Sequence, residues 1–319
     1  MMTTTTPLRI LVAINPAASF GSSVHVGPLV VAGLRDSGHT VTDLLEGTAH
    51  DLAGAVAREL AAAEADGVQP DALVVVGGDG MVSLAVNALA GTGIPLGIIA
   101  CGTGNDTARG LGLPVGNPAA ALAALLVALR HPPRDIDAVR VTRADSSTVW
   151  FAGVLSAGFD AIVNERANSL RYPRGKRRYT LALLIELVRL RAVRYRLTFG
   201  ATDEGVPATL VESAMLVSAG NGVSIGGGMR VTPNALLDDG LLDVLVVRPL
   251  SRVSFLRIFP RVFAGTHLSD PRVAVYRAGR VRIEEVGSSD VAAYADGERV
   301  GPLPLDLEVV PRALRVLVN

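Results

Sequence analysis

The feature that most constrains this chain is a β-branched run that ends in three glycines around one carboxylate, Val74-Val75-Val76-Gly77-Gly78-Asp79-Gly80-Met81. Residues 72–76 predict a buried parallel strand and residues 82–89 have helical periodicity, so the glycines lie at a strand-to-helix turn. Glycine lets backbone NH groups approach a phosphate closely, and the helix N-terminus that follows favours negative charge. The segment therefore predicts a phosphate-binding loop, with a tight turn that merely holds an aspartate as the alternative.

A second loop of the same kind follows one strand–helix unit later. The apolar strand predicted over residues 95–100 leads into Cys101-Gly102-Thr103-Gly104-Asn105-Asp106. In an open α/β sheet such turns meet at the carboxyl edge, which puts Asp79 and Asp106 on one rim. Two carboxylates beside phosphate-binding amides indicate a nucleotide held together with Mg²⁺. The chain has neither Gly-x-x-x-x-Gly-Lys-Ser/Thr nor Gly-x-Gly-x-x-Gly, so neither a Walker-type ATPase nor an ordinary dehydrogenase fits.

Composition and charge limit the class of protein. The 319 residues are 49% hydrophobic and 19% charged, which is typical of a globular protein with room for two domains. Thirty basic and thirty acidic residues cancel, so we expect no nucleic-acid partner. One cysteine, Cys101, suits a reducing cytosol. There is no signal-peptide pattern, and the apolar run at 119–129 is too short to span a bilayer, so we expect a cytoplasmic protein that would meet any lipid substrate peripherally, from the cytosol.

Two domains are predicted from the order of the elements. Residues 1–137 alternate strands and helices, which predicts an α/β domain with a doubly wound parallel sheet, and residues 138–309 hold mostly short strands, which predicts an antiparallel, sandwich-like all-β domain. In the first domain we expect strands at 8–14, 39–45, 72–76 and 95–100 and helices at 26–37, 52–65, 82–89 and 119–129. In the second we expect strands at 149–154, 208–219, 241–247, 272–276 and 280–284.

One segment of the second domain departs from the strand pattern. Residues 171–178 hold five cations and no acid, and they precede a leucine-rich helix expected at 179–194. Near an anionic membrane each cation contributes about 1 kcal/mol of attraction. A solvated loop before a core helix explains the same sequence, and so does contact of some of these cations with ATP phosphates.

The motifs, taken in order, resemble the diacylglycerol kinase catalytic family, and most closely its bacterial soluble lipid kinases. They span nearly the whole chain: Asn15-Pro16, Gly77-Gly78-Asp79-Gly80, Gly102-Thr103 with Asn105-Asp106, Asn221-Gly222, Gly226-Gly227-Gly228-Met229, Asp238-Asp239-Gly240 and Asp296-Gly297-Glu298. The resemblance implies an NAD-kinase-like nucleotide-binding domain, to which a C-terminal strand at about 310–319 returns. Met81 stands where the family usually has threonine, and no basic residue follows Asn15-Pro16.

The resemblance also implies roles for individual residues. Asp137 would complete the environment of the catalytic Mg²⁺ through water, and a structural Mg²⁺ would be bound by Leu236, Asp239 and Leu241. Glu298 is the expected proton acceptor and Asp296 the second candidate, although without the family this turn would be an ordinary hairpin. ATP would be bound by Asn15, Gly77, Gly78, Asp79, Gly80, Met81, Val82, Ser83, Gly102, Thr103, Asn105, Asp106 and Arg171.

The activity implied is an ATP- and Mg²⁺-dependent transfer of phosphate to the primary hydroxyl of diacylglycerol or a similar lipid, giving phosphatidate and ADP. A kinase for sphingoid bases or other lipid alcohols, and an NAD-kinase-like enzyme with a soluble substrate, are the alternatives within enzymes. A nucleotide-sensing protein that binds membranes is the non-enzymatic alternative. Acyl-chain pockets are built from interchangeable leucines and valines, so the sequence leaves the acceptor open, as it does the oligomeric state, for which a homodimer is one option.

Overall fold

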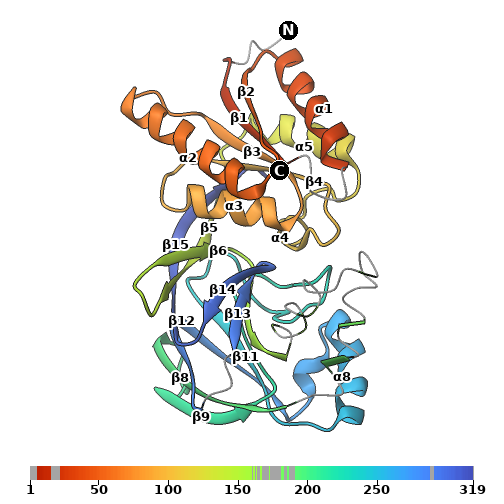
Figure 1. Ribbon diagram of the computed structural model, residues 1–319, viewed down its shortest axis with the longest axis vertical. Helices are drawn as coiled ribbons and strands as arrows, with labels where there is room; N and C mark the ends of the chain where they lie inside the picture. The colour runs from red at the N-terminus through yellow and green to blue at the C-terminus, as the bar shows by residue number, and fades with distance from the viewer. Residues whose placement is uncertain are drawn as a thin grey trace. The chain divides into compact units, whose positions relative to one another are not determined.

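The computed structural model describes residues 6–15, 22–159, 191–287 and 291–318, together with residues 161, 163, 166, 172, 181, 182, 185 and 186. The chain divides into two compact units (Figure 1). Unit 1 contains the residues up to Ile136 and those from Arg312 onward, and unit 2 is Asp137–Pro311. Each unit has its own buried apolar core.

Unit 1 is built on a parallel sheet in the order β4-β3-β1-β2. The last residue of β15 (Leu305–Val316) adds beside β4, with Val316 opposite Leu96. Every residue of β3 is buried, which explains why its sequence is a continuous apolar run. The strands are β1 (Arg9–Ile14), β2 (Thr40–Leu45), β3 (Ala72–Gly77) and β4 (Leu96–Ala100).

Helices pack on this sheet in two groups. Alternate residues of β1 and β3 form one core with α1 (Ser22–Asp36) and α5 (Pro118–Ala128). The helices α2 (Ala49–Ala65) and α3 (Asp79–Leu89) pack against each other and against the same strands, and the short α4 (Asp106–Gly110) follows β4. The doubly wound parallel sheet is therefore confirmed.

Side-chain caps fix where two of these helices begin. The Thr48 hydroxyl accepts a hydrogen bond from Asp51 N at 3.1 Å, which starts α2. Asn117 Oδ1 accepts from Ala120 N at 3.1 Å, and Pro118 occupies the first turn of α5. Both arrangements satisfy backbone NH groups that have no partner inside the helix.

Unit 2 is antiparallel, with strands in the order β14-β13-β7-β10-β11-β12-β15, which confirms the β-rich second domain. The strands β8 and β9 extend from β12, and β5 and β6 extend from β15. Their bounds are β5 (Arg134–Arg143), β6 (Thr148–Phe151), β7 (Val154–Gly158), β8 (Val193–Thr202), β9 (Thr209–Ala214), β10 (Leu216–Gly220), β11 (Leu242–Val247), β12 (Val273–Glu285), β13 (Ala292–Ala295) and β14 (Glu298–Pro302).

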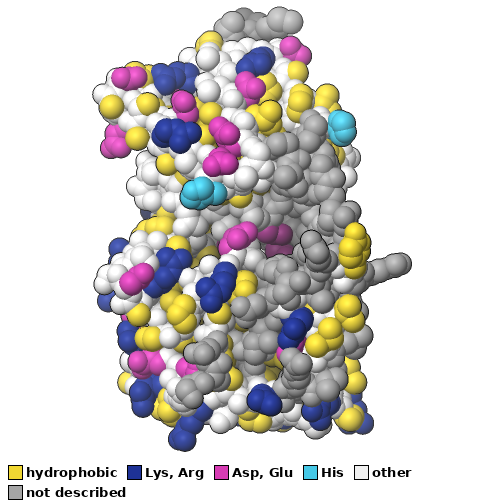
Figure 2. All heavy atoms as spheres, in the orientation of Figure 1, with side chains coloured by type: hydrophobic (Ala, Val, Ile, Leu, Met, Phe, Trp, Pro, Cys, Tyr) yellow, Lys and Arg dark blue, Asp and Glu magenta, His cyan; other side chains and the backbone are white. Residues whose placement is uncertain are grey.

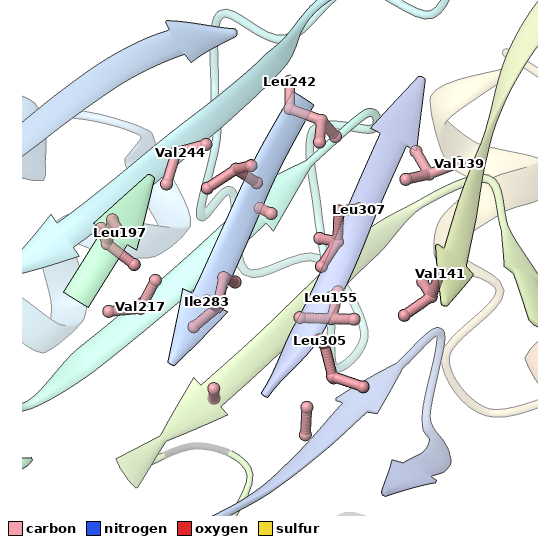
Figure 3. Close-up of a cluster of buried hydrophobic side chains, with 14 of the residues drawn as sticks. Val139, Val141, Leu155, Leu197, Val217, Leu242, Val244, Ile283, Leu305 and Leu307 are labelled. Carbon is pink, nitrogen blue, oxygen red and sulfur yellow. The ribbon is translucent and has the colours of Figure 1, made fainter. Parts of the chain in front are cut away.

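The core of unit 2 is formed by alternate residues of these strands. Figure 3 shows Leu155, Val217, Ile283 and Leu307, from four different strands, in one cluster of buried side chains. Residues two apart on a strand face the same side of a sheet, which is why the apolar positions alternate along the sequence.

Several expected elements of unit 2 were wrong in extent. The helix expected at 179–194 does not reach its end, because Val193 and Arg194 pair with β9 as the start of β8. The strand expected at 208–219 is two strands, β9 and β10, separated by Met215. The strands expected at 272–276 and 280–284 are one strand, β12, because β8 pairs with it on both sides of Gly279, from Ala278 to Glu285.

One helix of unit 2 was missed altogether. The helix α8 (Arg252–Ala264) begins where Ser251 Oγ accepts from Ser254 N at 3.2 Å, and it ends at Gly265, which has a positive φ of 71°. Both ends are ordinary helix boundaries. The helix was overlooked because Pro260 lies within its sequence, and proline is unfavourable inside a helix.

Candidate nucleotide and catalytic site

The two glycine loops come together in unit 1, as the sequence predicted. Gly77 at the end of β3 is the register partner of Ala100 at the end of β4, and Cys101 N donates to Gly77 O at 2.9 Å. Each loop leads directly into a helix, α3 after the first and α4 after the second. Two helix N-termini at neighbouring strand ends form the kind of edge that binds phosphate.

Glycine is required where the loops touch. A Cβ built on Gly102 would lie 2.4 Å from the Cα of Gly78, and one built on Gly78 would lie 3.1 Å from the Cα of Gly102. Both neighbours are backbone atoms, which have little freedom to move away. The two glycines therefore let one loop backbone rest on the other.

Asp79 holds the second loop by its carboxylate, a role that the sequence did not predict. Asp79 Oδ2 accepts from Asn105 N at 2.7 Å and Oδ1 accepts from Asp106 N at 2.7 Å. Burial, followed by the charge of Asp106, raises the pKa of Asp79 above its ordinary 3.8, and the backbone NH groups oppose that rise. Asp79 is thus a clasp between the loops, and its assignment to metal or ribose stays a prediction.

Asn105 shapes the second loop from within. It has a left-handed backbone with φ 56°, its Oδ1 accepts from Gly102 N at 2.9 Å, and its Nδ2 donates to Gly102 O at 2.8 Å. Asparagine tolerates this conformation better than most residues do. Its side chain is committed to the loop, whereas Thr103 at the tip is exposed and open to a ligand.

The remaining predicted nucleotide residues differ in how they are placed. Gly80 is exposed in the first turn of α3, but Met81, Val82 and Ser83 are buried, so only their backbone amides are available to a phosphate. The loss of a hydroxyl at Met81 therefore removes nothing from the surface of the loop. Asn15 is buried at the end of β1. Arg171 and Pro16 lie outside the described residues, as does most of the basic run 171–178.

The Asp-Gly-Glu turn is a tight hairpin between β13 and β14. Asp296 and Gly297 have positive φ angles of 49° and 86°, as a two-residue type I′ turn requires, and Ala295 pairs with Glu298. Glu298, the first residue of β14, is exposed. Read as local structure alone, the turn is the ordinary hairpin that the sequence allowed.

The two carboxylates of this hairpin have different environments. Asp296 Oδ2 accepts from Ala152 N and Gly153 N, each at 3.1 Å, and Oδ1 accepts from Val154 N at 3.0 Å. A Cβ on Gly153 would lie 2.3 Å from Asp296 Oδ1, so only glycine fits there. Asp296 therefore holds the 152–154 loop, and Glu298 is the carboxylate left to face outward.

Asp137 is buried in unit 2 and joined to two of the motifs. Its Oδ2 accepts from Gly240 N at 2.7 Å, and its backbone carbonyl accepts from Asn221 Nδ2 at 3.1 Å. Asn221 also donates to Ala152 O at 2.9 Å, so it links Asp137 to the loop that Asp296 holds. Asn221 was visible in the sequence as part of a motif but was given no role.

The residues expected to bind a structural Mg²⁺ are held by a different cation. Asp239 Oδ1 accepts from Leu241 N at 3.0 Å, and its other oxygen forms an ion pair with Arg277. Arg277 also pairs with Asp243 and Asp203, each at 3.2 Å. Arg277 pairs with one oxygen of Asp239, but its single positive charge leaves three carboxylates with a net charge of −2, so the Mg²⁺ site at Leu236, Asp239 and Leu241 stays a prediction.

No group of three or more histidine, cysteine, aspartate or glutamate side chains among the described residues lies close enough to bind a metal ion. No helix within the same residues has the length and apolar character needed to cross a bilayer.

Comparison with known proteins identifies the family. Residues 9–141 match the family profile of the diacylglycerol kinase catalytic domain, and residues 153–318 match that of the YegS C-terminal NAD kinase beta sandwich-like domain. The chain belongs to the diacylglycerol kinase catalytic family. It is therefore a kinase, with both domains of the family present.

Relatives and solved structures agree with this assignment. The chain is 41% identical over 310 residues to a diacylglycerol kinase of Mycobacterium tuberculosis (strain ATCC 25618 / H37Rv), covering 97% of this chain and 94% of that one. It is 32% identical to a protein of Xanthomonas euvesicatoria pv. vesicatoria (strain 85-10) named probable lipid kinase YegS-like, covering 82% and 83%. A crystal structure of a diacylglycerol kinase from Bacillus anthracis str. Sterne has the same fold, with a TM-score of 0.70, 21% identity and coverage of 99% and 98%.

Proposed function

We propose that this kinase transfers the γ-phosphate of ATP to the primary hydroxyl of diacylglycerol, giving phosphatidate and ADP. The observation that carries the proposal is the clasped pair of loops in unit 1, where Asp79 joins two glycine turns that each open a helix. The names of the similar proteins support a lipid acceptor. A sphingoid base or another lipid alcohol is the alternative lipid acceptor, and NAD is the alternative soluble acceptor.

The loops are suited to the phosphates of ATP. Phosphoryl transfer depends mainly on positioning and on neutralising charge. Backbone NH groups at the start of α3, beside Gly78 and Gly80, would cradle phosphate, and Thr103 would hydrogen-bond the nucleotide. Neither contact needs a side chain at Met81, Val82 or Ser83.

Mg²⁺ is proposed as the partner of ATP. Aspartate oxygens are its preferred protein ligands, and it commonly keeps water and substrate phosphates in the rest of its shell. The repulsion that helps to raise the pKa of Asp79 comes from Asp106, and a divalent cation beside these two carboxylates would relieve it. Asp106 would therefore help to hold the ion, and the ion would neutralise phosphate charge.

Glu298 is the proposed proton acceptor for the lipid hydroxyl. It is exposed and ends the two-residue turn, whereas both carboxylate oxygens of Asp296 accept backbone NH groups. Asp296 would act by holding the hairpin on the 152–154 loop. The lipid oxygen, once deprotonated, would attack the γ-phosphorus in line with the leaving ADP.

A panel of acceptors tests the proposal. The full-length protein is incubated with ATP labelled in its γ-phosphate, with MgCl₂ and with diacylglycerol, sphingosine, monoacylglycerol or NAD in turn. The proposal expects label in phosphatidate and at most a trace in the other products. Label in sphingosine phosphate or in NADP would show that sphingosine or NAD, and not diacylglycerol, is the acceptor. ATP binding without any transfer would favour the nucleotide-sensing alternative. The same assay with MgCl₂ replaced by EDTA tests the requirement for the ion.

The place of action is also proposed. A kinase whose acceptor lies in a bilayer has to work at a membrane surface, and the cations of residues 171–178 are one candidate for attraction to anionic lipid. Fractionation of cells is expected to give the protein in the cytoplasmic fraction with a salt-sensitive share on membranes.

A further inference from the structure

The outward face of α8 is apolar, contrary to the usual pattern of a surface helix. Val253, Leu256 and Phe263 are 58%, 53% and 50% exposed, and Pro260 between them is also exposed. These four residues are spaced by three and four positions, so they form one stripe along the helix. We call them the α8 stripe.

The opposite face of the same helix explains how α8 is held. Ile258 is buried, and Phe255 packs edge-on against Phe159 with ring centroids 5.0 Å apart. Val262 joins a small cluster with Val231 and Leu245. The helix is therefore anchored to unit 2 by its inner face, and the α8 stripe is not needed for that packing.

The charged residues of α8 itself have one sign. The helix contains three arginines and no acidic residue, and Arg252 and Arg257 are both exposed. Arg252 lies in the first turn of the helix. Arg230, also exposed, lies close to Gly265 at the other end. Figure 2 shows hydrophobic side chains at the edge of the molecule where Figure 1 shows α8.

We infer that the α8 stripe is a membrane-docking surface, which inserts into the interface of a bilayer that contains anionic lipid. Apolar side chains flanked by arginines are the composition of helices that lie in the plane of a membrane interface. Arg252, Arg257 and Arg230 would meet lipid phosphates while Val253 and Leu256 enter the acyl boundary. The inference rests on the proposed lipid kinase function, which gives the protein a reason to approach a bilayer.

A second copy of the chain fits this face less well. Two copies of α8 packed together would bring arginines near arginines, with no acidic side chain on the helix to pair with them. A helix of 13 residues is about 20 Å long and about 10 Å wide, so one of its faces offers about 200 Å², well below the roughly 800 Å² that each partner buries in a stable interface. An anionic membrane complements the charge and sets no such requirement.

Vesicle binding tests the inference. The probe is a vesicle of equal parts phosphatidylglycerol and phosphatidylcholine, and binding is measured by co-sedimentation. The double variant Val253→Thr with Leu256→Gln is expected to bind at least about tenfold more weakly than wild type, because two partly inserted apolar side chains are lost. The matched control is Leu29→Gln on α1, where the leucine is 64% exposed, and its binding should equal that of wild type.

A charge variant and an activity assay complete the design. The variant Arg252→Gln with Arg257→Gln should bind the mixed vesicles more weakly, and should lose the salt dependence of binding that these two side chains contribute. Each variant should phosphorylate a short-chain diacylglycerol, dissolved as monomer, at the wild-type rate. Weaker vesicle binding together with an unchanged rate on the monomeric substrate would show that the variants affect membrane docking and not phosphate transfer. If neither wild type nor any variant phosphorylates a lipid alcohol while vesicle binding still depends on the α8 stripe, the lipid kinase proposal fails and the docking surface stands.

Three results would overturn the inference. Wild-type protein that does not bind the mixed vesicles has no such surface, and equal binding by wild type and both double variants would place the contact elsewhere. The third result would come from sedimentation velocity of the protein without vesicles. A dimer of wild type that becomes a monomer in Val253→Thr with Leu256→Gln would assign the stripe to a second copy of the chain.

Discussion

Replacing Asp296 with asparagine tests the hydrogen bonds by which its carboxylate holds the 152–154 loop, which we call the Asp296 clasp. The substitution keeps the turn, because Asn-Gly is a favoured pair for a type I′ hairpin. The asparagine oxygen can still accept from Ala152 N and Gly153 N, but its amide nitrogen then faces Val154 N–H, which donated to a carboxylate oxygen at 3.0 Å. An unsatisfied buried donor costs about 1–3 kcal/mol, and two bonds lose their charge assistance. We expect unit 2 to lose about 3 kcal/mol of unfolding free energy.

Urea unfolding measures this loss. The chain has one tryptophan, Trp150, and it lies on β6, so tryptophan fluorescence reports on unit 2. The control is Glu298→Gln, two residues away, which is exposed and should shift the unfolding free energy by less than about 0.5 kcal/mol. An unfolding midpoint for Asp296→Asn equal to that of the control would refute the clasp, and with it the division of roles between the two carboxylates.

Three further predictions concern the loops and the arginine cluster. Gly102→Ala should destabilise unit 1 by about 2 kcal/mol and weaken ATP binding in calorimetry, whereas Gly47→Ala, with open space around its Cα, should do neither. Asp106→Asn should lower the raised pKa of Asp79, which NMR titration measures. A carboxyl whose pKa is raised by folding makes the protein less stable as the pH rises above 3.8, so the same substitution should make the unfolding free energy in urea fall less over that pH range. Arg277→Met should cost about 2 kcal/mol of unfolding free energy at pH 7, since it leaves three carboxylates together; a wild-type protein that is less stable in EDTA than in MgCl₂ would support the predicted magnesium site at Asp239.

The sequence was sufficient to locate the two loops and the fold of unit 1. Their features are local: a buried strand, a glycine turn and a helix, each with a period or composition of its own. The contacts made by Asp79 were not predictable in the same way, because its partners lie 26 and 27 residues away. Only the positions of both loops in the folded sheet show that its carboxylate faces backbone amides.

In unit 2, contacts between residues far apart in the sequence could not be predicted. Arg277 meets Asp203, 74 residues away, and Asp239, 38 residues away, so no spacing in the sequence marks the cluster. The strand β8 begins at Val193 within a stretch that favours a helix, because pairing with β9 outweighs local propensity. The helix α8 was hidden for another reason: Pro260 lies inside it, and a proline within a sequence argues against a continuous helix there.

The account as a whole is tested most directly by the rate of phosphate transfer in wild type and in Glu298→Gln. The assay follows γ-labelled ATP and diacylglycerol in mixed micelles with MgCl₂, and ATP affinity is measured separately. We predict that wild type moves the label into phosphatidate, and that the variant does so about 10²- to 10⁴-fold more slowly while its ATP affinity is unchanged. Label that never reaches a lipid, or a variant as fast as wild type, would contradict the account.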